Sequence, residues 1–233
     1  FADAGLQFIF TGHSHMQNIG FITTERGNTF YDINTGSLVG YPTPIRRVTL
    51  DEEKMIISTE KLETFDWDFK GKDPQQYLQD QFDFLLNDIF NSMANDFEHF
   101  VSLAGGFSMT REKAEKLKIP IKLIGKTMQK LTLGKAGRLL WVSGKIDKSI
   151  KDVLIKDLMV EIVRNIFSGN EHYSPDTPTY QAIMALICRL QIFMKRFAKG
   201  NTILSDLPSF IASLIYDDTP DNDSVIPIQK YKG

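Results

Sequence analysis

The chain carries 27 Lys and Arg residues against 29 Asp and Glu residues over a length of 233, so its net charge at neutral pH is −2. Its residues are 42% hydrophobic and 24% charged, a composition typical of a folded globular protein with one or two domains. A nearly neutral chain gives no overall electrostatic argument for binding nucleic acid or a membrane. No apolar run approaches the roughly 20 residues that a membrane-spanning helix needs, so the sequence predicts no transmembrane segment.

The sequence leaves the cellular compartment open. Its one cysteine, Cys188, excludes an internal disulfide, and its helix-like surroundings favour a buried structural thiol over a reactive one. The first residue is Phe1 rather than Met, and the opening residues lack the basic and apolar regions of a signal peptide. We expect the chain to be a piece of a longer protein, in which any signal peptide would lie upstream. Cytoplasm, cell envelope and exterior therefore all stay open.

The first quarter of the chain predicts β-structure. Residues Leu6–Thr11 form a nearly continuous apolar run, which indicates a strand that is buried on both faces and has neighbours on both sides. The next two β-rich runs, Gly20–Thr24 and Thr29–Asn34, flank the turn residues Glu25–Asn28. This arrangement predicts a β-hairpin.

A second hairpin is predicted farther along the chain. Arg46–Leu50 and Met55–Thr59 flank the polar segment Asp51–Lys54 in the same way. Alternation of apolar and polar residues predicts one buried face, made of Val48, Leu50, Met55 and Ile57.

From Asp73 onward the apolar residues recur with helical spacing. Asp73 and Pro74 suit the start of a helix, as an N-cap followed by proline at the first position. The apolar stripe that follows continues as far as Phe100, which predicts one helix of about seven turns. The remaining helices are expected from Thr110 to Pro120, over 121–133, from Asp147 or Lys148 to Phe167, from Thr177 to Ala198 and over 205–216. We expect Pro120, Gly134 and Gly137 to end or interrupt helices.

These patterns predict an α+β chain in three parts. Residues 1–66 form the β-rich part, 67–216 form an all-α helical domain, and the polar, proline-containing residues 217–233 form an extended or partly disordered tail.

His13 and His15 are the residues whose types point most directly to chemistry. They follow the first predicted strand, and Gly12 permits the chain to turn there. Two imidazoles separated by one residue can face the same pocket, and neutral imidazole is the side chain most often used to hold first-row metals. Ligands commonly bind beyond the carboxyl ends of strands in α/β sheets. The spacing alone fits a metal site and also fits two polar loop histidines.

Two segments together resemble one enzyme family. Residues Phe10–His15 read FTGHSH, which resembles the last conserved block of calcineurin-like metallophosphoesterases, where a strand runs into a Gly-His-x-His loop. Residues Ile33–Pro42 read INTGSLVGYP and are similar to the Asn/Gly/Ser segment that follows that loop. The nearest subgroup is the cyclic nucleotide phosphodiesterase-like branch. The resemblance covers residues 4–64, about a quarter of the chain.

The resemblance implies a four-layer αββα fold and a dinuclear metal centre. In such enzymes the first histidine of the pair binds one metal ion and the second binds the other, which carries over to His13 and His15. The metals expected are Mn, Fe or Zn, and the nucleophile is a hydroxide that bridges them and attacks the phosphorus of a phosphodiester or cyclic nucleotide. Gly12 and Tyr41 would border the substrate pocket, although the segment from Tyr41 to Pro44 fits a rigid turn equally well.

The chain also departs from the family pattern. The earlier blocks, Asp-x-His, Gly-Asp-x-x-Asp, Gly-Asn-His-Glu and a further lone histidine, are absent, and His99 and His172 do not replace them. Only two metal ligands are then present, so we expect the chain to be inactive alone. Its first expected partner is the missing N-terminal part of the same domain, which would complete the hydrolase.

Two alternatives concern the helical part. It could be a binding or dimerisation module that forms a homo-oligomer. The segment from Arg111 to Lys151 is rich in lysine, which fits either a nucleic-acid-binding surface of a nuclease in the same superfamily or an ordinary solvated helix face. No aromatic residues are interleaved with these lysines, which favours the solvated face.

Overall fold

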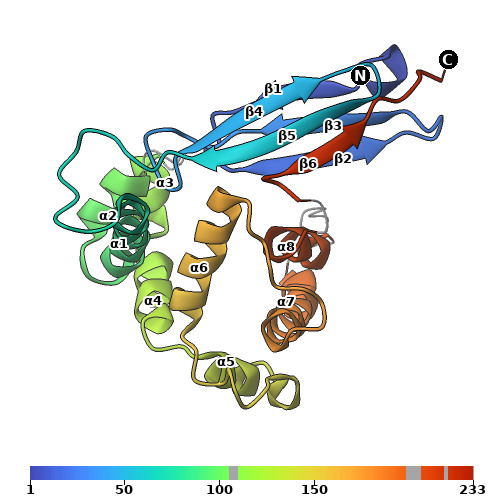
Figure 1. Cartoon of the computed structure of the whole chain (residues 1–233). Helices are drawn as coiled ribbons and strands as arrows, with labels where there is room; N and C mark the ends of the chain where they lie inside the picture. Colours follow the sequence, from blue (N-terminus) through green and yellow to red (C-terminus); the bar gives the residue numbers. More distant parts are fainter. Residues whose placement is uncertain (105–109, 198–205, 218–219, 233) are drawn as a thin grey trace. The chain divides into compact units, whose positions relative to one another are not determined.

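A computed structural model of the chain describes residues 1–104, 110–197, 206–217 and 220–232 (Figure 1). The chain is a mixed α+β protein and divides into two compact units. The first unit contains Phe1–Phe82, Val163–His172 and Asp217–Gly233, and the second contains Asp83–Ile162 and Tyr173–Tyr216. The units therefore alternate along the chain, whereas the division at 1–66, 67–216 and 217–233 stays a prediction.

Three strands of the first unit form the first sheet. They are β1 (Phe8–Thr11), β2 (Asn18–Thr23) and β3 (Thr29–Asn34), and their order in the sheet is β1-β3-β2. β1 runs parallel to β3, and β2 runs antiparallel to it. The predicted hairpin is confirmed as the β2–β3 pair, whose turn contains Gly27 with a φ of 78°.

The second sheet contains the other predicted hairpin and a strand from the predicted tail. β4 (Pro44–Leu50) pairs antiparallel with β5 (Lys54–Lys61), and β6 (Ser224–Pro227) pairs with the other edge of β5. Asp51 closes the β4–β5 turn, because its Oδ1 accepts 2.8 Å hydrogen bonds from the backbone N–H groups of Glu53 and Lys54. The tail is thus part of a sheet.

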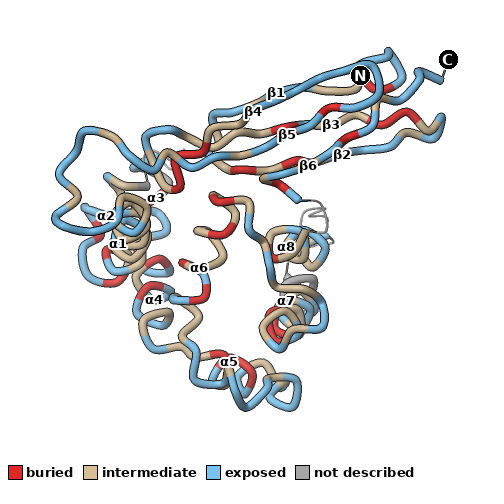
Figure 2. Tube along the Cα trace, in the orientation of Figure 1, coloured by how far each residue is buried: buried red, intermediate tan, exposed pale blue. Residues whose placement is uncertain are grey.

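The core of the first unit consists of apolar residues from both sheets. Its buried members are Ile19, Ile33, Met55, Ile57 and Ile226, which belong to β2, β3, β5 and β6 (Figure 2). β3 and β5 are the central strands of their sheets, so their side chains are covered best.

The edge strands are more exposed than predicted. β1 has a described neighbour only in β3, and its Phe10 is 52% exposed, so the prediction of a strand buried on both faces is wrong here. Val48 and Leu50 share a face with Ile57 and Met55 as predicted, yet both are exposed because β4 is an edge strand.

The described residues contain eight α-helices, and none is long and apolar enough to cross a membrane. Their bounds are α1 (Pro74–Asn95), α2 (Phe97–Ala104), α3 (Arg111–Lys116), α4 (Lys118–Met128), α5 (Leu133–Leu139), α6 (Ile155–Ser168), α7 (Pro178–Phe197) and α8 (Leu207–Ile215). Cys188 of α7 is exposed, so its predicted burial is wrong.

Two corrections concern where helices end. The long helix predicted to reach Phe100 breaks at Asp96, whose Oδ1 accepts a 3.1 Å hydrogen bond from the N–H of His99 and so caps α2. Pro120 does not end a helix. It lies in the first turn of α4, where its missing N–H group would have no helical partner.

Helix α6 begins eight residues later than predicted from Asp147, because the preceding segment has other backbone partners. The Oδ1 of Asp147 accepts a 2.8 Å bond from the N–H of Ser149. The carbonyl oxygens of Val153 and Lys151 accept bonds of 2.9 and 2.8 Å from the N–H groups of Leu133 and Gly134. These bonds hold the segment against the start of α5 and prevent an earlier helix.

Gly134 lies inside α5 rather than interrupting a helix, and so does Gly137. A Cβ atom at Gly134 would lie 2.8 Å from the carbonyl oxygen of Lys151, which is closer than real Cβ contacts come. A Cβ at Gly137 would lie 2.6 Å from Cγ1 of Ile146. The glycines therefore permit close packing, which the sequence pattern alone does not distinguish from helix breaking.

Replacing Gly134 by Ala is expected to lower the free energy of unfolding by about 1–3 kcal/mol, because the new methyl group meets a backbone carbonyl that cannot move freely. This loss should exceed the roughly 1 kcal/mol that alanine gains in helix propensity. Urea denaturation checks it. Gly144→Ala is the matched control, since nothing lies within 4 Å of a Cβ there, and equal stability of both variants would contradict the prediction.

Candidate functional site

The loop that carries the histidine pair leaves the first sheet beside the end of β3. β1 and β3 are parallel, and Thr11 is in register with Asn34, so both strands end at one edge of the sheet. The N–H of Thr35 donates a 3.0 Å hydrogen bond to the carbonyl of Thr11, which keeps the segments that follow β1 and β3 together beyond the sheet. This is the type of edge at which α/β sheets commonly bind ligands.

The backbone of the histidine loop is strained. The N–H of Ser14 donates to the carbonyl of Gly12 at 2.9 Å, and His13 between them has a φ of 73°. These values match the rare γ-turn with positive φ. His15 also lies in the left-handed region, with a φ of 60°. Each such non-glycine residue costs about 1–3 kcal/mol, and such strain is concentrated at functional sites.

The amide side chains of Asn34 and Gln17 support this loop from within the unit. Asn34 donates through Nδ2 to the Oγ of Ser14 at 2.7 Å, while its buried Oδ1 has no hydrogen-bond partner among the described residues. Gln17 is fully buried and accepts a 3.0 Å bond from the N–H of Gly36 in the loop after β3. His13 and His15 themselves are exposed. The two imidazoles are therefore exposed to solvent on a loop that the hydrogen bonds of Asn34 and Gln17 hold in place.

The four residues expected at the site lie in two segments. Gly12, His13 and His15 share the loop after β1, and Tyr41 belongs to the connection between β3 and β4. The Tyr41 ring is half-buried, and its centroid lies 6.0 Å from that of Phe82. A role for Gly12 and Tyr41 at the rim of a pocket stays a prediction.

Two imidazoles suit a transition metal, but they are only part of a complete ligand set. Within residues 1–104, 110–197, 206–217 and 220–232, no group of three or more His, Cys, Asp or Glu side chains is arranged to hold a metal ion. His99 lies elsewhere, paired at 2.6 Å with Asp88, whose hydrogen bond and charge raise the pKa of the imidazole.

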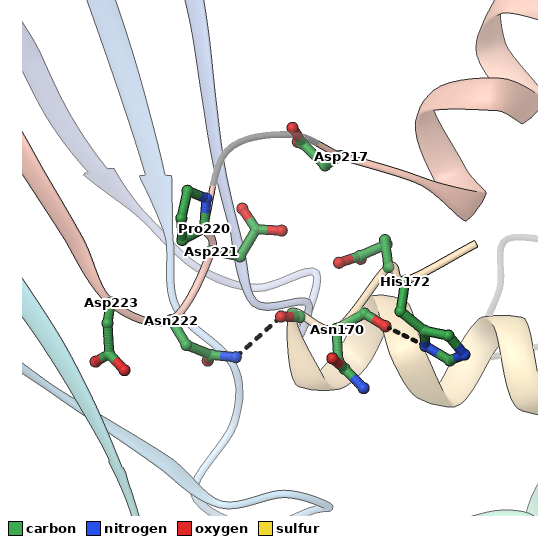
Figure 3. A pocket seen from close by; sticks show the side chains of 9 residues that line it. Asn170, His172, Asp217, Pro220, Asp221, Asn222 and Asp223 are labelled. Carbon is green, nitrogen blue, oxygen red and sulfur yellow. Dashed lines mark hydrogen bonds between the residues drawn. The ribbon is translucent and has the colours of Figure 1, made fainter. Parts of the chain in front are cut away.

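A second polar site lies in the first unit, after helix α6. It is a pocket of about 320 Å³, formed by the segment that follows α6 and the segment that precedes β6 (Figure 3). Its lining is mostly acidic and amide side chains, with one imidazole: Asn170, Glu171, His172, Asp217, Asp221, Asn222 and Asp223. The Nδ1 of His172 lies 3.1 Å from the carbonyl oxygen of Asn170.

The segment before β6 is attached to this pocket by several hydrogen bonds. Asn222 donates through Nδ2 to the carbonyls of Ser168 and Gly169, both at 2.9 Å. Asp221 accepts a 2.5 Å bond from the N–H of Ile19 in β2, and its carbonyl accepts a 2.8 Å bond from Arg46. The segment is therefore joined to both sheets and to the end of α6.

Two carboxyl groups of the pocket have raised pKa values. Burial, together with the charge of Asp221, raises the pKa of Glu171 to about 8. Burial also raises the pKa of Asp221, although the N–H of Ile19 opposes this. Burial lowers the pKa of the nearby Arg46 to about 10, against the attraction of Asp221. Carboxyl groups with raised pKa values are candidates for proton transfer as well as for structural roles.

Sequence reasoning missed this pocket. The run of Asp and Asn residues from 217 to 223 was predicted as part of the polar tail, and no role was predicted for Glu171. The available signal was the β-branched pair Val225 and Ile226, which follows the acidic run and is typical of a short strand. A strand there would have brought the acidic run onto the sheets.

No protein-family model matches the chain, and a comparison with curated proteins gives no match either. The interpretation of the site therefore depends on its residues and geometry.

Replacing Glu171 by Gln is expected to flatten the pH dependence of stability. Because the pKa rises from 4.5 to about 8 on folding, the folded chain holds the extra proton between these pH values. The free energy of unfolding then falls as pH rises through this range. The amide mimics the protonated acid and cannot ionise, so the variant should be more stable than the original chain at pH 8.

Urea denaturation between pH 5 and pH 8 measures this effect, with the upper limit set by the Glu171 pKa of about 8. The exposed Glu63, changed to Gln, is the control and should keep the original slope. A Glu171→Gln chain that loses stability with pH as steeply as the original would show that this carboxyl does not bind the proton.

Proposed function

We propose that this chain is the C-terminal portion of a metallophosphoesterase and contributes His13 and His15 to its metal centre. The observation that carries the proposal is the conformation of the histidine loop. Both histidines have positive φ values at the carboxyl end of β1, next to the end of the parallel strand β3. Strain at two exposed histidines needs a functional reason, and holding transition metals is one that their chemistry supplies.

The side chains around the loop support this role. Asn34 fixes Ser14 through one amide atom and leaves its buried Oδ1 as an acceptor at the same edge. Carbonyl oxygens and neutral imidazoles together suit Mn, Fe or Zn. When bound, two such metal ions lower the pKa of a water ligand and stabilise the attacking and leaving oxygens of a phosphodiester. His13 and His15 would each hold one ion, and the absence of a side chain on Gly12 would leave room for substrate.

The rest of the ligand set would come from another part of the domain. β1 has an edge without a described strand partner, and its Phe10 is 52% exposed. An added strand could form hydrogen bonds along this edge and cover the apolar side chain. We propose that the N-terminal part of the same domain does so and brings the remaining ligands, so that this chain alone does not hydrolyse phosphodiesters.

Manganese(II) added to this chain is expected to broaden the imidazole NMR signals of His13 and His15 before that of His99. Paramagnetic broadening depends on proximity, so it reports which imidazoles bind the metal. His99 is the internal control, because it is paired with Asp88. Broadening of a control signal first, or of none, would contradict the proposed ligands.

The complete domain should hydrolyse bis-p-nitrophenyl phosphate in a metal-dependent way. In a polypeptide that joins this chain to the N-terminal part, His13→Ala or His15→Ala should reduce kcat about a hundredfold or more. Loss of a residue that only supports a metal ligand already lowers activity roughly 10- to 100-fold, and loss of the ligand itself should cost at least as much. His99→Ala is the matched control and should keep full activity. Unchanged hydrolysis after both loop substitutions would exclude this pair from the metal centre.

A further inference from the structure

Trp141 in the second unit is exposed and conformationally strained. It follows helix α5, it is 72% exposed, and its φ is 55°. Positive φ is a genuine outlier for a bulky side chain and costs about 1–3 kcal/mol. Neighbouring Leu139 is also exposed, at 69%. A strained backbone that presents a large ring to solvent suggests a binding surface.

Trp141 belongs to a cluster with two residues of helix α7. The guanidinium carbon of Arg189 lies 5.8 Å from the centroid of the Trp141 ring and 5.3 Å from that of Phe193. The two ring centroids lie 5.9 Å apart. Arg189 also donates through Nε to the carbonyl of Leu140 at 3.1 Å, which fixes the guanidinium beside both rings. These three residues, Trp141, Arg189 and Phe193, are called the Trp141 platform.

The elements that form the platform are strongly basic. Between Leu133 and Lys151 the sequence has five basic residues and one acidic residue, Asp147. Asp147 uses its carboxylate to bind the N–H and hydroxyl of Ser149. The basic side chains Lys135, Arg138, Lys145, Lys148 and Lys151 are exposed, and helix α7 has no acidic residue. The charge near the platform is therefore positive, although the whole chain is nearly neutral.

A pocket lies where residues 144–148, which follow Trp141 in the sequence, meet the start of α7. It has a volume of about 630 Å³, and its lining includes Lys145, Asp147, Lys148 and Tyr180. The short 3-10 helix at Ser143–Lys145, which carries part of this lining, packs against both α5 and α7. The segment from Trp141 to Lys148 thus has the Trp141 platform at its beginning and a pocket with two lysines at its end.

We propose that the Trp141 platform binds single-stranded nucleic acid. Bases stack on exposed aromatic rings whatever their sequence, while nearby cations bind the phosphates, and an arginine can add a cation–π contact. The platform supplies the ring, and the exposed lysines and Arg138 supply the charge. A duplex keeps its ring faces stacked inside and offers none to Trp141. An acidic peptide would satisfy the charges but would leave the ring without a partner.

This inference does not depend on the metal site of the first unit. It does revise the interpretation of the basic segment. The sequence contains no aromatic residues among the lysines up to Leu140, but the fold brings Phe193 beside Trp141 from far along the chain.

The experiment uses the full chain and an oligo(dT) of about 15 nucleotides, the upper range of single-strand site sizes. The fluorescence anisotropy of an end-labelled oligo(dT) measures binding by every variant, and quenching of Trp141 in a Trp67→Phe chain, where it is the sole tryptophan, reports stacking on that ring. Trp141→Ala should weaken binding about five- to hundredfold, whereas Trp141→Phe should keep most of it. Trp67→Ala is the matched control, because Trp67 is 62% exposed, and should bind as the original chain does.

The salt dependence of oligo(dT) binding tests the contribution of the basic side chains. Arg138→Gln should reduce the slope of log K against log salt by about 0.7, the value for one phosphate contact on a single strand. Lys54→Gln, on the first unit, should leave the slope unchanged. Undetectable binding, binding by a folded Trp141→Ala chain equal to the original, or equally tight binding of duplex DNA or dextran sulfate would each overturn the proposal.

Discussion

Gln17 is buried and connects several segments of the first unit. Its Oε1 accepts the N–H of Gly36, and its Nε2 donates to Thr59 at 3.1 Å and to Asn222 at 3.3 Å. Its backbone N–H reaches the carbonyl of Ile166 at 3.4 Å. One residue thus joins the histidine loop, the loop after β3, the second sheet, helix α6 and the segment before β6. A buried amide is costly when it lacks partners, so these contacts are mutually dependent.

This dependence explains how the unit can hold a strained loop. The left-handed conformations of His13 and His15 are unfavourable in themselves. The hydrogen bonds of Gln17 and Asn34 fix the residues on either side, so the loop cannot relax without breaking contacts of the whole unit. The exposed imidazoles are therefore held in place by hydrogen bonds that also connect the rest of the unit.

Local patterns predicted the elements that depend on local physics. The two hairpins follow from turn residues such as Gly27 and Asp51, and the helix starting at Pro74 follows from its cap. The predictions were wrong where contacts between distant segments of the chain determine the local structure. Gly134 resembles a helix breaker until Lys151 is known to lie against it, and β6 resembles a tail until it pairs with β5. The same holds for the candidate sites. His13 and His15 lie close enough in the sequence to be proposed as a pair, whereas Glu171 with Asp221, and Trp141 with Arg189, meet only in the folded chain.

The pairing of β6 with β5 also bears on how the protein is made. Met55 in β5 pairs with Ile226, so more than two thirds of the chain, residues 62–223, lies between two neighbouring strands of one sheet. Synthesis proceeds from the N-terminus, and domains usually fold as units once their residues are available. The first unit cannot complete its second sheet until residues 224–227 have left the ribosome. Until then Met55 and Ile57 lack the cover of Ile226, and the free edge of β5 is open to other chains or to chaperones.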